Sequence, residues 1–183
     1  MEPLFLAGGA VALIVIIAGG LVWRRRRQYG PRLRRLLVLH SDARVREVVI
    51  PDGLDGHIQV DNILRTKAGF VVVDVVKANG AVFGGDRIDE WTVMGGGRAH
   101  KFRNPLAANN ARVLAVRALV PGVPVYGLVI LLGEVSFPKG TPARTVTLDS
   151  LSAALQALPQ LPPTPAVDVD QAWYGLSASA ESA

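Results

Sequence analysis

A buried stretch from Gly69 to Gly80 constrains the fold more than any other part of the chain. Its sequence, GFVVVDVVKANG, is rich in β-branched and aromatic residues and shows no polar alternation. We therefore expect a strand that is buried on both faces. One carboxylate, Asp74, lies in its middle. Because an unpaired carboxylate in a core costs several kcal/mol, Asp74 is predicted to be paired, bound to a metal, or at the edge of a site.

Composition narrows the classes of function. The 183 residues can hold one domain with appendages, and the absence of cysteine excludes disulfides, thiol catalysis and thiolate metal sites. The three histidines (40, 57 and 100) lack zinc-site spacing, which favours structural roles. The net charge is +5, but residues 36–183 hold 13 basic and 14 acidic residues, a net charge of −1. The domain itself therefore lacks a broad cationic surface for DNA, although a local basic patch is compatible with its sequence.

The N-terminal segment is predicted to anchor the chain in a membrane. Leu4 to Trp23 is a run of twenty uncharged residues, about the length needed to cross ~30 Å of hydrocarbon. Seven arginines follow between positions 24 and 35. The positive-inside rule then places the N-terminus outside and the domain in the cytoplasm, at the inner (cytoplasmic) membrane. We interpret these arginines as a topology signal that also contacts anionic lipids, in preference to a DNA-binding segment.

The rest of the chain predicts an α/β fold, with a mixed central β-sheet flanked by helices. Strands are expected at 45–50, 58–65, 81–83, 91–93, 100–102, 123–132 and 146–148, a helix from Asn104 and Pro105, and a last helix ending at 158. Strand 58–65 should form an antiparallel hairpin with 69–80, which brings Asp61 toward Asp74. The triple glycine at 95–97 indicates a hairpin turn. The Pro-rich residues 159–183 are expected to be a disordered tail, with Trp173 and Tyr174 as a docking point.

Six short motifs resemble the nuclease-related domain family, NERD. They are Gln59-x-Asp61, the strand with Asp74, Lys77 to Gly80, Phe83-Gly84, Trp91-Thr92, and Lys101 to Pro105. The resemblance covers residues 30–158, between the anchor (1–29) and the tail. It implies a restriction-endonuclease-like, PD-(D/E)xK fold, a family that often follows one transmembrane helix.

The resemblance also implies a site for Mg²⁺. In the family pattern two strand acids bind the metal, and these match Asp61 and Asp74, with Gln59 as a helper. A lysine two positions after the second acid stabilises the phosphate, because residues i and i+2 share a face of a strand. That position is Val76 here, and the lysine of this chain is the displaced Lys77.

Other positions depart from the family pattern as well. The glutamate of the first helix has no counterpart in residues 29–37, Asn62 replaces a histidine, and Ala108 replaces a glutamine. Three hypotheses follow: a nuclease-like domain with a degraded site that binds nucleic acid, an active Mg²⁺-dependent nuclease, and a membrane scaffold in which Asp74 pairs with Arg65 or Lys77. A protein partner for the tail is compatible with each of them.

Overall fold

The computed structural model describes residues 29–159 and 167–181. Contacts divide the chain into Met1–Arg35 and Leu36–Ala183, and the fold below is that of the second unit. Among the described residues, no helix has the length and apolarity to cross a bilayer. The span expected at 4–23 lies outside them. Residues 29–39 are helical.

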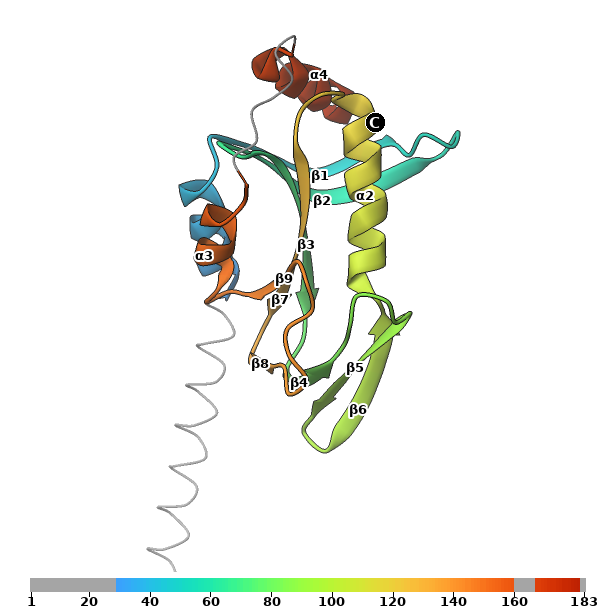
Figure 1. The fold of residues 1–183 in the computed structure, drawn as a ribbon, viewed down its shortest axis with the longest axis vertical. Helices are drawn as coiled ribbons and strands as arrows, with labels where there is room; N and C mark the ends of the chain where they lie inside the picture. The colour runs from blue at the N-terminus through green and yellow to red at the C-terminus, as the bar shows by residue number, and fades with distance from the viewer. Residues whose placement is uncertain (1–28, 160–166, 182–183) are drawn as a thin grey trace, which may run out of the picture. The chain divides into compact units, whose positions relative to one another are not determined.

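A five-stranded sheet forms the larger part of the fold (Figure 1). Its order is β1-β2-β3-β7-β9, from β1 (Ala43–Pro51), β2 (His57–Thr66), β3 (Gly69–Lys77), β7 (Val125–Leu132) and β9 (Thr145–Thr147). The first three strands pair antiparallel, and β3, β7 and β9 pair parallel. The predicted hairpin is confirmed, the strand predicted at 123–132 is β7, and the strand predicted at 146–148 is β9, at the edge of the sheet.

A second, four-stranded sheet corrects the expectation of one central sheet. Its order is β6-β5-β4-β8, from β4 (Gly80–Phe83), β5 (Glu90–Gly95), β6 (Arg98–Arg103) and β8 (Val135–Ser136). Strands β4, β5 and β6 are antiparallel, whereas β8 adds in parallel to β4. The turn between β5 and β6 is the predicted glycine hairpin, with positive φ at Gly96 and Gly97. The protein is therefore a mixed α/β fold with two mixed sheets.

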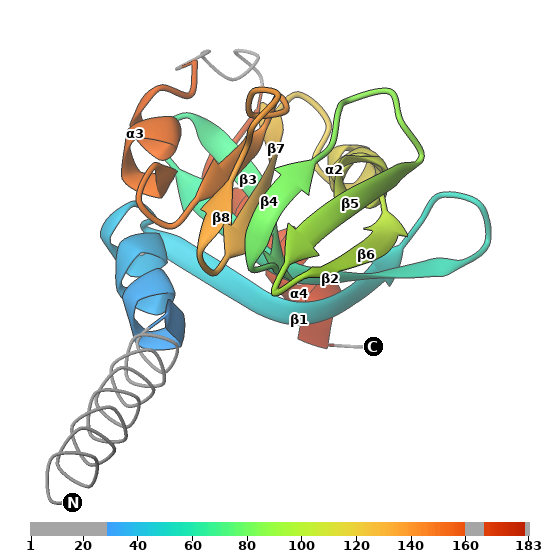
Figure 2. The same ribbon diagram turned by 90° about the horizontal axis from the view of Figure 1, so that it is seen from below.

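Helices cover both faces of the larger sheet (Figure 2). Helix α2 (Pro105–Leu119) lies on one face and α3 (Leu151–Gln156) on the other. As predicted, α2 begins at Asn104, whose Oδ1 accepts a hydrogen bond from the Leu106 amide at 2.9 Å. The Asn104 side-chain Nδ2 also donates a hydrogen bond to the Ile88 carbonyl oxygen at 2.8 Å. Asn104 thus fixes the start of α2 against the loop before β5.

Residues 167–181, which belong to the segment 159–183 predicted to be a disordered tail, are ordered in the structure and correct that prediction for this part of the segment. Residues Val169–Glu181 form helix α4. Trp173 and Leu176 are 7% and 2% exposed and join the core made by β1, β2, β3 and α2. The Trp173 ring meets Phe70 edge-on, with centroids 5.2 Å apart. Of the two residues expected to form a docking point, Trp173 therefore packs into this chain's own core, whereas Tyr174 is exposed.

Candidate functional site

The candidate site lies where β2 and β3 separate. The hairpin ladder between them runs from Thr66↔Gly69 to Ile63↔Val72, and the same register would set Asp61 opposite Asp74. At the next position the Asn62 side chain enters the gap, where its Nδ2 donates to the Val73 carbonyl at 3.4 Å. The loss of backbone pairing opens the sheet beside the two acids.

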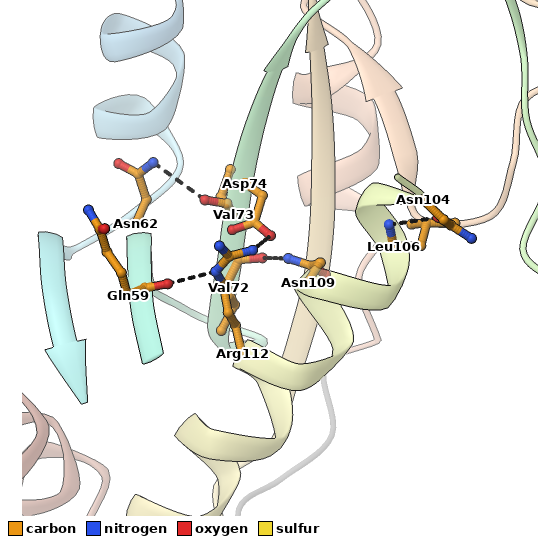
Figure 3. Close-up of polar contacts among 9 residues, drawn as sticks. All are labelled: Gln59, Asn62, Val72, Val73, Asp74, Asn104, Leu106, Asn109 and Arg112. Carbon is orange, nitrogen blue, oxygen red and sulfur yellow. Dashed lines mark hydrogen bonds and ion pairs between the residues drawn. The ribbon is translucent and has the colours of Figure 1, made fainter. Parts of the chain in front are cut away.

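Arg112 of α2 bridges this gap (Figure 3). Its Nε donates to the Gln59 carbonyl oxygen at 2.7 Å, and its Nη1 donates to Asp74 Oδ2 at 2.9 Å. The Asp74 side chain is 7% exposed and the Arg112 side chain 24%. One guanidinium therefore replaces part of the missing ladder, joins the helix to both strands, and supplies the counter-charge of the buried carboxylate.

Asn109 lies on the same face of α2, three residues before Arg112. It is fully buried, and its Nδ2 donates to the Val72 carbonyl at 3.2 Å (Figure 3). A Cβ at Gly127 would lie 2.1 Å from Asn109 Oδ1, so only glycine leaves room for this amide. Within the described residues, Asn109 Oδ1 and Asp74 Oδ1 are both buried without a hydrogen-bond partner. The site thus has two unsatisfied acceptors.

Burial raises the pKa of the Asp74 carboxyl above its ordinary value of 3.8. The Arg112 guanidinium and the Asn109 amide act in the opposite direction, and the negative charge of Asp61 adds to the rise. The two predicted acids lie on neighbouring strands of the same hairpin, so the charge of Asp61 disfavours the charged form of Asp74. Arg112 therefore compensates the buried charge only in part.

Replacing Asp74 with asparagine is expected to raise the free energy of unfolding at pH 7 by about 1 kcal/mol. A raised pKa means that the neutral carboxyl's stabilising contribution is present below pH 3.8 and lost as the pH rises through the pKa in the folded state. An asparagine at position 74 is neutral at every pH of the experiment. Its Nδ2 can donate to Asn109 Oδ1 while its Oδ1 accepts from Arg112.

Urea unfolding of the full chain in nonionic detergent, followed by circular dichroism at pH 3.5 and pH 7, would test this. The gain should appear at pH 7 and vanish at pH 3.5. Asp61→Asn, which changes a half-buried acid that makes no ion pair with Arg112 among the described residues, is the comparison, and it should give a smaller gain because it removes only the negative charge near Asp74. A variant less stable than wild type at pH 7 would contradict the expectation.

The four predicted site residues and Val76 divide between two environments. Asp61 of β2 is half-buried and Asp74 of β3 is buried. Gln59 is exposed, and it is its backbone carbonyl that joins the site. Lys77 is exposed at the end of β3, where strand alternation puts it on the face opposite Asp74. Val76, on the same face as Asp74, packs against a second hydrophobic core, which contains Trp91, Leu106 and Leu131.

In this arrangement the residues do not fit a resident Mg²⁺. The ion takes oxygen ligands in near-octahedral geometry. Asp74 Oδ2 is engaged by a guanidinium, whose positive charge would repel a cation at that carboxylate. The described part of the chain also holds no group of three or more histidine or acidic side chains placed to bind a metal. Asp74 Oδ1 is the one carboxylate oxygen here that is both buried and without a partner.

Sequence reasoning missed Arg112 and Asn109. It proposed Arg65 or Lys77 as partners of Asp74, but Arg65 Nη1 pairs with Asp170 Oδ1 at 2.6 Å. The available signal was the Asn109-x-x-Arg112 spacing, which puts both polar side chains on one face of a helix predicted to cover the buried strand. A polar pair on such a face needs a buried partner, and Asp74 was the candidate acid in the facing strand.

A comparison with protein families matches the nuclease-related domain over residues 25–132, more than half of the chain. The chain belongs to the nuclease-related domain (NERD) family. Likeness to the PD-(D/E)xK nucleases is consistent with this assignment. No curated protein and no solved structure matches the chain. The NERD match includes β1 to β7 and α2, and therefore the whole candidate site, and it ends before β8, β9, α3 and α4.

Proposed function

We propose that this NERD protein is a membrane-anchored module that binds nucleic acid at the cytoplasmic face and has lost the ability to cut it. The observation that carries the proposal is the ion pair between Arg112 and Asp74. A side chain of the protein engages the carboxylate that the family pattern assigns to the metal. The domain keeps the family fold while the site is held together by hydrogen bonds.

The position of Val76 supports the loss of cleavage. It packs into the second core at the place where the family pattern has the phosphate-stabilising lysine, and Lys77 is exposed on the other face. Loss of one preorganised charge-stabilising group costs roughly 10²- to 10³-fold in rate. With Asp74 already paired, the remaining groups offer little stabilisation to a phosphate under attack.

The membrane anchor in this proposal rests on sequence. Residues 4–23 form an uncharged apolar run of bilayer length, and the arginines between 24 and 35 follow at once. The positive-inside rule places a domain behind such an anchor in the cytoplasm, the compartment in which it would encounter nucleic acid. Anchoring would hold the bound nucleic acid close to the membrane surface.

The full chain in nonionic detergent is expected to show no Mg²⁺-stimulated cleavage of DNA or RNA above the level of Asp74→Ala. It should nevertheless bind labelled oligonucleotides, and the affinity should fall as salt increases. Cleavage can be followed on denaturing gels and binding by fluorescence anisotropy. Mg²⁺-dependent cleavage that disappears in Asp74→Ala would overturn the proposed loss of activity, and absence of binding would favour a scaffold without a nucleic-acid role.

The second candidate is an active Mg²⁺-dependent nuclease. It would use Asp61 and Asp74 for the metal, with Gln59 as helper and Lys77 as displaced cation. The buried, unpartnered Asp74 Oδ1 is the observation that favours it. Isothermal titration of the full chain with MgCl₂ separates the candidates: binding lost in the Asp61→Ala, Asp74→Ala double variant would support the nuclease.

A further inference from the structure

Strand β6 presents a concentration of positive charge at a sheet edge. It is an edge strand of the four-stranded sheet (Figures 1 and 2). Five of its six residues are exposed. Residues 91–103 contain Arg98, His100, Lys101 and Arg103 and no acid. The unit from residue 36 onward is close to neutral, so this is a local basic patch on a domain with no general excess of positive charge.

The two ends of β6 differ in their surroundings. Arg103, at the end near α2, lines a hollow together with Asp86, Asp89 and Glu90, so its charge is offset. Arg98 lies beside the glycine turn and has no carboxylate partner among the described residues. Lys101 Nζ lies 3.7 Å from Glu90 Oε2, but both side chains are more than half exposed, so water and salt screen this pair and Lys101 can exchange Glu90 for a phosphate. The net positive end is therefore the one that carries Arg98 to Lys101.

We infer that the segment Arg98 to Lys101 of β6 contacts the phosphate backbone of nucleic acid. This inference rests on the proposed function and names the surface that performs it. The charge is complementary to a polyanion, and nearly all of the strand is open to solvent. Long cationic side chains on both faces of an edge strand can reach successive phosphates without base-specific contacts.

The chain connects this surface to the candidate site. Strand β6 leads through Asn104 directly into α2, and Arg112 lies seven residues beyond Pro105, about 10 Å along the helix axis. A backbone that follows β6 toward α2 would thus approach the helix that carries Arg112.

Arg98→Gln with Lys101→Gln tests the inference, and Lys67→Gln with Lys139→Gln is the matched control. Both pairs remove two charges from exposed positions. The probe is a fluorescein-labelled single-stranded 20-mer, as DNA and as RNA, added to the full chain in nonionic detergent. Two lost phosphate contacts should weaken binding about 25-fold at ~0.1 M salt and reduce the slope of log K against log salt by about 1.4. The control should bind like wild type.

The outcomes separate this inference from the proposed function. Binding by wild type that is equal in the β6 variant and the control would overturn the β6 surface and leave the proposed function intact. No binding by wild type to either probe would overturn both. Cations on an edge strand also oppose edge-to-edge association, so size-exclusion chromatography accompanies each titration. If the glutamine variant self-associates, Arg98→Glu with Lys101→Glu keeps the edge charged. The affinity of this glutamate variant for the probe should fall more than 25-fold below that of wild type.

Discussion

Replacing Trp173 with alanine is expected to lower the free energy of unfolding by about 3–5 kcal/mol, the cost of removing a large aromatic side chain from a core. Trp173 is 7% exposed and packs edge-on against Phe70 of the central strand. It belongs to the core that also contains Val113 and Val116 of α2. The loss would therefore leave a cavity between α4 and the elements that position the candidate site.

Tyr174→Ala is the matched control, because the adjacent aromatic residue is 71% exposed. It should change the free energy of unfolding by less than about 0.5 kcal/mol. Asp170→Asn should also have a small effect, since Asp170 is exposed in its 2.6 Å ion pair with Arg65. Circular dichroism at 222 nm during urea unfolding of the full chain measures all three. Equal stability of the Trp173 and Tyr174 variants would show that α4 does not dock as described.

The helix around Trp173 could have been predicted from its own residues. Val169, Ala172, Trp173 and Leu176 have the i, i+3, i+4, i+7 spacing of one apolar helix face. Asp168 caps the start, because its Oδ1 accepts from the amides of Asp170 and Gln171 at 2.9 and 3.1 Å. The proline-rich residues before it dominated the composition and led to the prediction of disorder. Composition averaged over a window concealed a short periodic segment.

Elements with local causes were predicted well. The valine run makes β3, the Asn104-Pro105 pair starts α2, and glycines close the β5–β6 hairpin. The division into two sheets depends instead on long-range pairing: Gly80 pairs with Val135 in the parallel contact between β4 and β8. No pattern near either residue specifies that partner. Sheet membership of short strands is decided by packing across the whole chain, beyond the reach of sequence periodicity.

The candidate site shows the same division. Asp61 and Asp74 lie on the two strands of one hairpin, whose register follows from a short turn and an alternating strand, although its ladder ends at Ile63↔Val72, before the two acids. Arg112 is 38 residues from Asp74 in sequence and meets it only because α2 packs on that face of the sheet. The prediction that the buried Asp74 carboxylate needs a partner is confirmed. Which residue supplies that partner depends on the orientation of α2 on the sheet, and the sequence pattern does not specify this orientation.

Replacing Arg112 with methionine is expected to lower the free energy of unfolding by about 2–4 kcal/mol. Methionine keeps much of the apolar stem but leaves Asp74 as a buried charge without its counter-ion, a change that costs ~3–5 kcal/mol in fully buried pairs. The Arg112 side chain is 24% exposed, so water can reach the vacated position and lessen the penalty. The Gln59 carbonyl also loses its hydrogen bond at the point where the β2–β3 ladder is interrupted.

Combining Arg112→Met with Asp74→Asn isolates the charge pair. The double variant should regain most of the lost stability, because a neutral amide no longer needs the guanidinium, so the two changes should couple by at least about 1.5 kcal/mol. Arg117→Met is the control on the same helix: Arg117 donates to the Val125 carbonyl at 2.7 Å from an exposed position, and its loss should cost about 1 kcal/mol. Additive effects of the two site changes would mean that Arg112 stabilises the fold through Gln59 and packing alone. The Asp74 carboxylate would then be available to another cation, and the nuclease candidate would regain its metal ligand.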